Sequence, residues 1–513
     1  MVINRIERIT MGILSLMVIL AGCQAGDGNG GGNGGTTPAQ NPIPTLSSMT
    51  PDAAVTRMPA FALEVKGNGF VDGARVVFND RELDTAFVDS TTLTATVEPG
   101  STSMSAAGGN SLSPPRGESV TVRVRNPSPG GGDSGSLDFT IHANFVFETP
   151  RPISDPGHDA YHGKIHVTAD GRVEAAWHET WGSDNRRARM RHSGDGGESW
   201  SPIHTISASA SSVNPTLCRD GDDALHCVFA YTAKVPGSAL RHTISTDNGA
   251  TWSTPVTIRG SDFGAYPLLI AGADGTIHLI CRALEVTAFR LDDNGASWGT
   301  GVEISSRRHS PTDLDACRDE KDNLFVLWSQ AVGKDPTDTR LWFSRSLNSG
   351  MDWLAPQIVR ELGPWNSTNH VSLAAGTNRH LAAAWSLFSR TGYGNDFPVE
   401  FRSANKSGNV WSALKRMHSA GSNAGSSELC TDPAGNVHLF LTDDAVQRDA
   451  FRLRFRRSTD NGMFWTSAVF VKNVTRRYLD PSAACDAAGN VYGVFTDKLN
   501  GRNTVFFTRS RIP

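Results

Sequence analysis

The motif Ser-x-Asp-x-Gly-x-x-Trp recurs along the C-terminal part of the chain, and this repeat constrains the fold more than any other feature. Complete copies occupy residues 193–200, 245–252 and 458–465. Degenerate copies lack the Ser, replace Asp with Asn or carry one extra residue, and they end at Trp298, Trp353 and Trp411. The spacing is roughly 50 residues, which is typical of one four-stranded propeller blade. The repeat therefore predicts a β-propeller.

Each position of the motif has a physical role in a hairpin. The Asp carboxylate accepts hydrogen bonds from N–H groups of its own turn, the Gly adopts a positive φ, and the Trp covers the seam between neighbouring sheets. We therefore expect the motif residues to stabilise turns and to do no chemistry, namely Asp195, Trp200, Asp247, Trp252, Asp293, Trp298, Asp460 and Trp465.

These copies resemble the Asp-box, or BNR repeat, of sialidases and related bacterial propellers. The resemblance covers residues 143–513. It implies a sialidase-like propeller in which the boxes lie on the outer part of each blade, away from the face that binds the ligand.

The N-terminus has the pattern of an export signal. Arg5 and Arg8 precede an apolar run that ends at Leu20, and this run is too short for a typical membrane-spanning helix. The sequence Leu20-Ala21-Gly22-Cys23 resembles the bacterial lipobox, which implies a signal peptide over 1–22 and lipidation of Cys23. An ordinary signal peptide with a chance Cys is the alternative.

The residues after Cys23 predict a surface-exposed lipoprotein. Gln24 stands where Asp is the usual mark for retention in the inner membrane of lipoproteins, so the resemblance implies the outer membrane or cell surface. Residues 23–42 are rich in Gly and Asn and have almost nothing apolar to bury, so we expect a flexible tether.

Residues 43–142 predict a small β-sandwich. Apolar residues alternate with polar ones around Leu63, Val76, Leu93, Val120 and Leu137, and turn residues separate these runs. The stretches 67–70, 92–95 and 124–127 resemble those of an IPT/TIG domain, which implies an immunoglobulin-like module. We expect it to act as a spacer, with contacts to other proteins as the alternative.

Residues 143–513 contain seven strand hairpins of similar pattern. The seventh repeat stops after a third strand at 505–510, and the segment 145–153 resembles a fourth strand without a hairpin of its own. Pairing these two segments removes both free sheet edges. We therefore predict an all-β chain: an immunoglobulin-like β-sandwich followed by a seven-bladed β-propeller closed by an N-terminal strand. Sialidases proper have six blades.

Six cysteines follow Cys23, at positions 218, 227, 281, 317, 430 and 485. Four of them occupy the same place in the first strand of different blades. We expect such equivalent sites to be too far apart for a disulfide, so buried thiols are favoured, with Cys218 and Cys227 as the exception. No spacing of Cys and His indicates zinc, and we expect no metal and no cofactor.

The loops that converge on one face of the propeller carry a mixture suited to sugars. Rings stack on apolar sugar faces, carboxylates accept bonds from hydroxyls, and Arg pairs with acidic sugars. The predicted ligand-binding residues are Tyr161, His162, His178, Glu179, Arg282, His309, His370 and Tyr478, and the same loops also contain Tyr266, Asp313 and Asp480.

Two enzymatic interpretations remain open beside a binding module. Sialidases hold the substrate carboxylate with three Arg and use a Tyr nucleophile activated by a Glu, so the resemblance implies Tyr478, Glu428, Arg282, Arg308 and Arg477 as catalytic candidates. The Arg-Ile-Pro signature of that family is replaced here by His162-Gly163-Lys164. A polysaccharide lyase is the second interpretation, with Tyr161, His162, His178 and Arg282 in its site.

Composition limits the partners. The formal net charge is −4 over 513 residues, with 48 basic and 52 acidic side chains. This balance provides no basic field for nucleic acid and no polybasic membrane patch. We therefore predict a surface lipoprotein that is attached to a membrane through Cys23 and recognises a carbohydrate or an extracellular protein, and we predict no nucleic-acid partner.

Overall fold

The computed structural model describes residues 39–511 apart from gaps at 56–59, 99–117, 143–144, 183–184, 210, 233–237, 261–265, 293–296, 307–308, 333–334, 365, 377–379, 390–397, 406–407, 418–423, 445–450 and 476–478. Within these ranges every regular element is a β-strand, and the strands form nine sheets. Among the residues described, none belongs to a helix long and apolar enough to cross a bilayer. Cys23 lies outside the described residues.

Residues 39–142 form two sheets. The first has the order β1 (Thr45–Thr50), β3 (Phe61–Asn68), β7 (Thr92–Val97) and β6 (Asp84–Asp89). The second has the order β2 (Ala53–Val55), β10 (Leu137–His142), β8 (Glu118–Asn126), β4 (Arg75–Phe78) and β5 (Arg81–Glu82), with β9 (Gly132–Asp133) beside β8. The five alternating runs of the sequence correspond to β3, β4, β7, β8 and β10.

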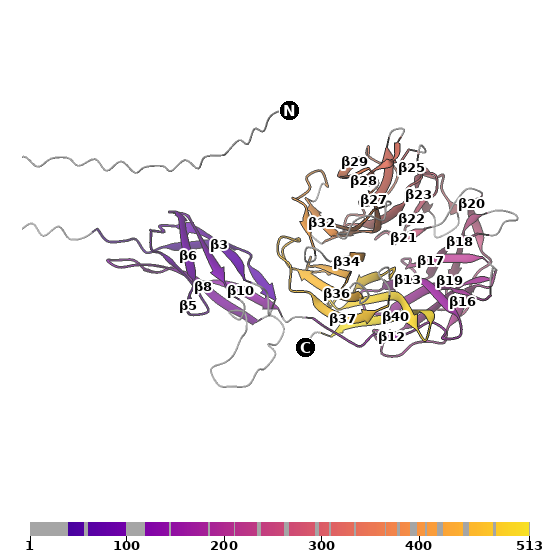
Figure 1. Cartoon of the computed structure of the whole chain (residues 1–513), viewed down its shortest axis with the longest axis horizontal. Coiled ribbons are helices and arrows are strands. Elements are labelled where there is room, and N and C mark those ends of the chain that lie inside the picture. The colour runs from indigo at the N-terminus through magenta and orange to yellow at the C-terminus, as the bar shows by residue number, and fades with distance from the viewer. Residues whose placement is uncertain are drawn as a thin grey trace, which may run out of the picture.

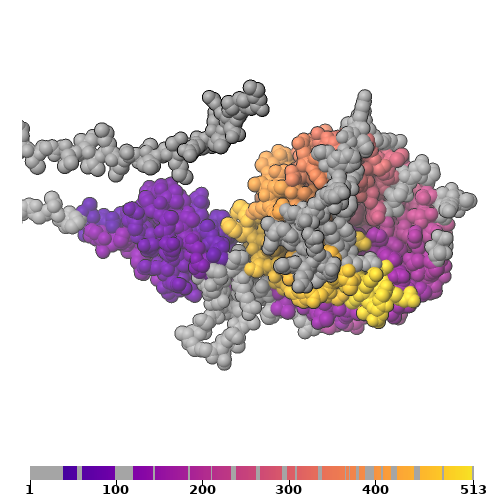
Figure 2. Space-filling view, in the orientation of Figure 1, coloured from indigo at the N-terminus to yellow at the C-terminus, as the bar shows by residue number. Residues whose placement is uncertain are grey.

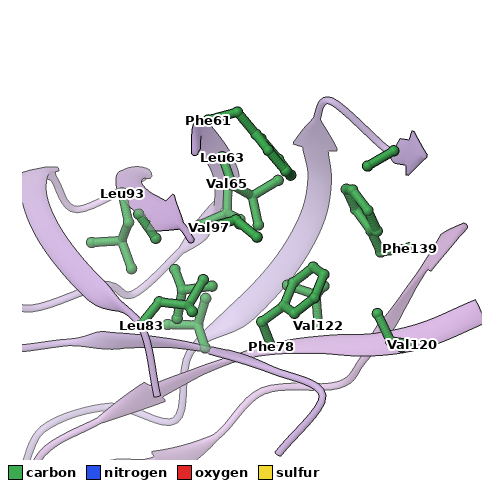
Figure 3. Close-up of a cluster of buried hydrophobic side chains, with 14 of the residues drawn as sticks. Phe61, Leu63, Val65, Phe78, Leu83, Leu93, Val97, Val120, Val122 and Phe139 are labelled. Carbon is green, nitrogen blue, oxygen red and sulfur yellow. The ribbon is translucent and has the colours of Figure 1, made fainter. Parts of the chain in front are cut away.

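The alternation in these strands places one apolar row of each sheet inside. Leu63, Val65 and Val122 are fully buried between the sheets (Figure 3). Phe139 packs edge-on against Phe78 at a centroid distance of 5.1 Å. This core lies between the two sheets, as in a β-sandwich.

Residues 146–511 form seven sheets, numbered here in chain order. Sheet 1 contains β13 (Asp159–Val167), β14 (Val173–Thr180), β15 (Arg186–Ser193) and β16 (His204–Ser207), and sheet 2 contains β17 (Ser212–Arg219), β18 (Leu225–Tyr231), β19 (Ala239–Ser245) and β20 (Val256–Gly260). Sheet 3 contains β21 (Leu268–Ala271), β22 (Ile277–Arg282), β23 (Val286–Asp292), β24 (Ser297–Trp298) and β25 (Val302–Glu303). Sheet 4 contains β26 (Asp313–Arg318), β27 (Leu324–Val332), β28 (Asp335–Ser346) and β29 (Gln357–Pro364).

The remaining sheets follow the same up-and-down order. Sheet 5 contains β30 (Asn366–Ala375), β31 (Leu381–Ser389), β32 (Val399–Ala404) and β33 (Lys415–Arg416), and sheet 6 contains β34 (Ala424–Thr431), β35 (Val437–Asp444), β36 (Phe451–Ser458) and β37 (Val469–Val474). Sheet 7 contains β38 (Ser482–Cys485), β39 (Val491–Leu499) and β40 (Arg502–Arg511), joined by β11 (Val146–Phe147) and β12 (Arg151–Pro152).

The first strands of these sheets pack against one another in sequence, β13 against β17 and so on to β34 against β38, and β38 packs back against β13. Figure 1 shows the sheets following one another around a common centre. The N-terminal segment joins the last strand, because Val146 pairs with Arg511 and Arg151 pairs with Phe507. The predicted pairing of these two segments is therefore present.

The Ser-x-Asp-x-Gly-x-x-Trp copies form turns after third strands. In the first copy, Ser193 Oγ donates to Asp195 Oδ1 at 2.7 Å and accepts from the N–H of Gly197 at 2.7 Å, while Asp195 accepts from the N–H of Ser199 at 2.9 Å. The same bonds recur around Asp247 and Asp460. Asp293 lies outside the described residues.

The turn also packs against the preceding sheet in the ring. Trp200 lies edge-on to Phe507 on β40 at 5.0 Å, and Trp465 lies edge-on to Phe401 on β32 at 5.0 Å. A Cβ on Gly462, whose φ is 83°, would lie 2.2 Å from the ring of Phe401. These positions therefore join neighbouring sheets, and Trp252 and Trp298 pack into the equivalent seams.

The expectation that equivalent cysteines lie too far apart is wrong for one pair. The sulfurs of Cys430 on β34 and Cys485 on β38 are 3.1 Å apart, and all six cysteines from 218 to 485 are free. The first strands of sheets 6 and 7 approach closely near the centre of the ring, which the sequence spacing does not reveal.

The small domain contacts the propeller near sheet 6. Phe464, in the turn before β37, packs against the core of residues 39–142 with its ring 6.4 Å from that of Phe61. Figure 2 shows the small domain as a separate lobe beside the propeller.

Candidate functional site

The central face of the propeller is built on bulged first strands. The pairing of β13 with β14 shifts between Tyr161 and Lys164, and the pairing of β30 with β31 shifts between Asn369 and Ser372. His162 and His370 lie in these bulges with φ of 52° and 54°. Asp480, just before β38, has φ of 44°. Residues other than Gly rarely adopt this conformation, so its recurrence at the centre of the ring makes this face the candidate site.

A row of aromatic and basic side chains starts at these bulges. The ring of His178 stacks 5.6 Å from Tyr161 and 5.4 Å from His162. His162 lies edge-on to Tyr266 at 6.0 Å, and the guanidinium of Arg282 lies 4.1 Å from the centre of the Tyr266 ring. We call these five residues the channel-face cluster. It comes from sheets 1 and 3 and the loop between sheets 2 and 3.

His178 is a neutral hydrogen-bond donor. Burial lowers the pKa of His178 to about 3, and the nearby His162 acts in the same direction. Its Nδ1 accepts from the N–H of Asn214 at 3.3 Å, so the ring proton is on Nε2. The neutral ring of His178 therefore carries its single proton on Nε2.

In His162 the Nδ1 atom faces an acceptor, whereas Nδ1 of His178 faces a donor. Its Nδ1 lies 3.4 Å from Oδ2 of Asp480, and Nε2 of His370 lies 3.7 Å from Oδ1 of the same carboxylate. Burial lowers the pKa of His162, while Asp480 opposes this shift. With the Nδ1 proton directed at Asp480, Nε2 of His162 keeps a lone pair and can accept a proton.

Arg282 is the cationic end of the cluster. Burial lowers the pKa of its guanidinium and Asp313 opposes the shift, so the group stays charged at neutral pH. Its Nη1 donates to the carbonyl of Pro311 at 3.0 Å. The Oδ2 of Asp313 accepts from the N–H of Val371 at 2.8 Å, and burial raises the pKa of this carboxyl group.

A second group of charges lies deeper in the ring, on the first strands of sheets 1, 4 and 6. Burial raises the pKa of Glu428 and of Asp315, and Lys164 opposes both shifts. Glu428 Oε1 accepts from the N–H of Ala483 at 3.4 Å, and Asp315 Oδ2 accepts from the N–H of Leu373 at 2.7 Å. The charge of Asp315 adds to the upward shift in the pKa of Glu428.

The structure brings some of the predicted site residues together and leaves others apart. It brings Tyr161, His162, His178 and Arg282 together, with His370 joined through Asp480. Glu179 is buried within sheet 1, where it accepts from Trp177 at 2.9 Å and pairs with Arg189 at 3.2 Å. The carbonyl of His309 accepts from the side chain of Gln330. Tyr478, Arg308 and Arg477 lie outside the described residues.

Tyr266 and Asp480 complete the site but were not among the predicted ligand-binding residues. Both occur in loops that the sequence assigned to this face. Each contacts His162 of sheet 1 from a loop that is distant in the chain. The spacing of residues within a single loop does not reveal such a contact. In the described ranges, no group of three or more His, Cys, Asp or Glu side chains is arranged to hold a metal ion.

Comparison with known proteins identifies the fold and no family. No family model matches the sequence, and no curated protein sequence matches it. A polysaccharide lyase of family PL25, an ulvan lyase bound to -[GlcA(1-4)Rha3S]-, is 13% identical over 71% of this chain and 95% of its own, with a TM-score of 0.51.

Two other solved structures are less similar in shape. A protein of unknown function from Dyadobacter fermentans is 14% identical over 72% of this chain and 99% of its own, with a TM-score of 0.46. The Hadza microbial sialidase Hz136 is 13% identical over 82% of this chain and 77% of its own, with a TM-score of 0.41. At such identities the likeness concerns the fold alone, and the chain is an all-β protein with a β-propeller fold.

Proposed function

We propose that this protein binds an acidic polysaccharide on its channel face and cleaves it by β-elimination, as a polysaccharide lyase. The observation that carries the proposal is the row of ring contacts that runs from His178 through His162 and Tyr266 to Arg282. This set contains a proton acceptor, a neutral N–H donor, a phenol and a fixed cation. The ulvan lyase of similar fold supports the choice of a uronate-containing polymer as substrate.

The reaction needs three operations on a uronate unit. The carboxylate must be neutralised so that the C5 proton becomes acidic, a base must remove that proton, and the oxygen on C4 must leave. The C5–H electron pair becomes the C4=C5 double bond as the C4–O bond breaks, and the departing oxygen takes up a proton.

Each operation has a suitable side chain. Arg282 pairs with the carboxylate and His178 donates its Nε2–H to it, since both groups are donors at neutral pH. His162 takes the C5 proton on Nε2, and Asp480 stabilises the imidazolium that forms. Tyr266, 43% exposed at the edge of the cluster, supplies a hydroxyl to the leaving oxygen.

Some assignments of the catalytic site change in this proposal. Tyr161 becomes a positioning residue, because its hydroxyl accepts from Asn503 Nδ2 at 2.5 Å and its ring supports His178. Three sialidase candidates, Tyr478, Arg308 and Arg477, lie outside the described residues, so the proposal rests on the residues of the channel-face cluster. A binding module without turnover remains the other outcome of the test.

The proposal extends to the whole chain. We propose a seven-bladed propeller with Asp-box turns, closed by the N-terminal strand, and an IPT/TIG-like immunoglobulin spacer over 43–142. The sheet order and the pairing of β11 and β12 with β40 support this arrangement. We also propose that lipidation of Cys23 anchors the protein to the outer membrane or cell surface, where such a polymer is accessible.

The test is a turnover assay on the -[GlcA(1-4)Rha3S]- polymer and on sialosides. We expect the wild type to release unsaturated uronate ends, detected by ultraviolet absorbance, and to release no sialic acid. His162→Gln removes the base, so we expect a loss of at least about 10²-fold in turnover. His204→Gln, in the outermost strand of the same sheet, is the matched control and keeps full activity. Release of sialic acid, or polymer binding without unsaturated product, contradicts the lyase assignment.

A further inference from the structure

Three arginine–aromatic pairs lie on neighbouring sheets of the propeller. The guanidinium carbon of Arg187 lies 4.1 Å from the ring centre of Trp181 in sheet 1. That of Arg241 lies 3.8 Å from the ring centre of Tyr231 in sheet 2. The pair of Arg282 and Tyr266 at sheet 3 belongs to the channel-face cluster. We call the first two pairs the arginine track.

The track lies on the same face of the ring as the cluster. Trp181 directly follows the end of β14, and Tyr231 and Arg282 are the last residues of β18 and β22, so all three mark the same end of equivalent strands. Tyr161 of the cluster pairs with His178, close to that end of β14. The two pairs and the cluster therefore lie at the same end of neighbouring sheets.

Among the described residues, the two arginines of the track differ from their neighbours in having no acidic partner. Arg189 pairs with Glu179 at 3.2 Å and Arg259 approaches Glu285 at 3.7 Å. For Arg187 and Arg241, by contrast, no carboxylate within ion-pair distance occurs in the described parts of the chain. Both side chains are half-buried, so stacking on a ring restricts them before any ligand binds.

Such a cation suits a carboxylate or sulfate group. A guanidinium forms paired hydrogen bonds with planar or tetrahedral anions. The guanidinium carbons of Arg187 and Arg241 lie over their rings, which limits the positions that these groups can take. The ring of Trp181 is also stacked on His158 at 3.9 Å, so its faces are already in use. Recognition at the track therefore depends on ligand charge more than on stacking of sugar rings.

We infer that Arg187 and Arg241 form an extended subsite for the acidic groups of a linear polysaccharide that runs from the channel-face cluster across sheets 2 and 1. This inference rests on the proposed function for the position of the cleaved unit. It adds that the ligand is a polymer carrying repeated carboxylates or sulfates, and that charges several sugars from the cleaved bond contribute to its affinity. Neutral glycans bind weakly.

The experiment measures binding separately from turnover. In the His162→Gln background, which prevents cleavage, calorimetry is used to measure binding of the -[GlcA(1-4)Rha3S]- polymer by the otherwise unchanged chain and by Arg187→Gln, Arg241→Gln and the double variant. We expect about tenfold weaker binding for each substitution. Raising the salt concentration weakens polymer binding by the parent more than polymer binding by the double variant. The double variant has fewer ion pairs with the polymer, so salt has fewer of them to screen.

Three further variants serve as controls. Arg81→Gln removes an exposed cation from β5 of the small domain, and we expect unchanged affinity. The lysine variants at 187 and 241 keep the charge but lose the planar stack, and we expect intermediate affinity. Circular dichroism of each variant checks that the fold is retained.

The outcomes separate the subsite from the lyase proposal. If the double variant binds the polymer as tightly as the parent, or loses affinity for a neutral glycan equally, the subsite is wrong. If wild-type protein binds the polymer through both arginines but forms no unsaturated product, the lyase assignment fails and the subsite stands. Cleavage of the polymer that is insensitive to both arginines supports the lyase assignment and contradicts the subsite.

Discussion

The Nδ1 of His162 lies 3.4 Å from Oδ2 of Asp480, although these residues belong to the first and the last sheet of the propeller. The contact exists because the first strands of sheets 1 and 7 are neighbours in the ring. The pairing of the N-terminal segment with β40 adds a further connection at this closure. The architecture of the ring therefore determines the protonation state of the proposed base.

Asp480→Asn tests this relationship. Asn tolerates the left-handed backbone found at Asp480, so we expect the variant to fold. Loss of the carboxylate removes the interaction that raises the pKa of His162, so we expect turnover to fall by about 10²-fold and the acidic limb of its pH profile to move to lower pH. The matched control is Asp80→Asn, at a left-handed position in the small domain. An unchanged pH profile in Asp480→Asn contradicts a positioning role.

Activity and pH are linked through the charge of His162. The base must be neutral, and burial lowers its pKa below the usual value of 6.5. We therefore expect kcat/KM to be constant near pH 7 and to fall only on acidification below the usual range of His. Asp480 and His370 face His162 from sheets 7 and 5, and Lys164 follows it on β13, so all three affect the midpoint. A midpoint at or above 6.5, measured on the polymer, contradicts this assignment.

We expect the stability of the fold to depend on pH through His242, which lies in the third strand of sheet 2. Burial and the neighbouring His226 lower the pKa of His242 to about 3, from 6.5. In the unfolded chain this residue takes up a proton below pH 6.5, so its contribution is complete above that value and decreases as the pH falls towards 3. Between pH 7 and pH 5 we expect a loss of about 2 kcal/mol from this group.

Urea unfolding at the two pH values measures this loss, and His242→Gln is the variant that tests its source. The substitution removes the titrating ring, so the difference between pH 7 and pH 5 becomes smaller by about the same amount. If the free energy of unfolding falls by the same amount between pH 7 and pH 5 in the wild type and in His242→Gln, groups other than His242 cause the loss.

The glycine of the repeated turn is required by two independent constraints. In Gly462→Ala the new Cβ lies at 2.2 Å from Phe401 on a backbone with φ of 83°, so we expect destabilisation of about 3 kcal/mol or more. Gly501→Ala has the same φ of 83° and nothing within 4 Å, so it costs only the backbone strain of about 1–2 kcal/mol. Urea unfolding measures the loss of stability in both variants. Equal losses in Gly462→Ala and Gly501→Ala contradict the packing role of the turn.

Cys430 and Cys485 are positioned for a disulfide between sheets 6 and 7. Their sulfurs are 3.1 Å apart, whereas bonded sulfurs are separated by about 2 Å. Treatment with oxidised glutathione transfers the electrons of both thiols to glutathione, and we expect mass spectrometry to detect a Cys430–Cys485 crosslinked peptide. The variant Cys430→Ser leaves Cys485 without its partner and abolishes the crosslink. If both thiols remain free after this treatment, the result contradicts the short distance between the sulfurs of Cys430 and Cys485.

Much of the fold was predictable because the turn motif is local. Ser193, Asp195 and Gly197 bond within a single turn, so their spacing alone predicts the hairpin. The complementarity of 145–153 with the last strand was also visible, since that segment had no hairpin of its own. The first and last segments of the repeat region were therefore enough to predict that they pair with each other.

The site was predictable only in part, because its contacts join distant sheets. The sequence named His162, His178 and Arg282 from loop position, but the role of each depends on contacts with Asn214, Asp480 and Tyr266. Likewise, the contact of Cys430 with Cys485 depends on how closely two inner strands approach. Such distances arise from the curvature of the ring, which spacing along the chain does not encode.

The most direct measurement is the proton NMR spectrum of the -[GlcA(1-4)Rha3S]- polymer after incubation with wild-type protein, His162→Gln and His204→Gln. If the lyase assignment is right, the wild type and His204→Gln give vinyl proton signals of a C4=C5 double bond, and His162→Gln gives none. Intact polymer in all three samples, or reducing ends without a double bond, contradicts it.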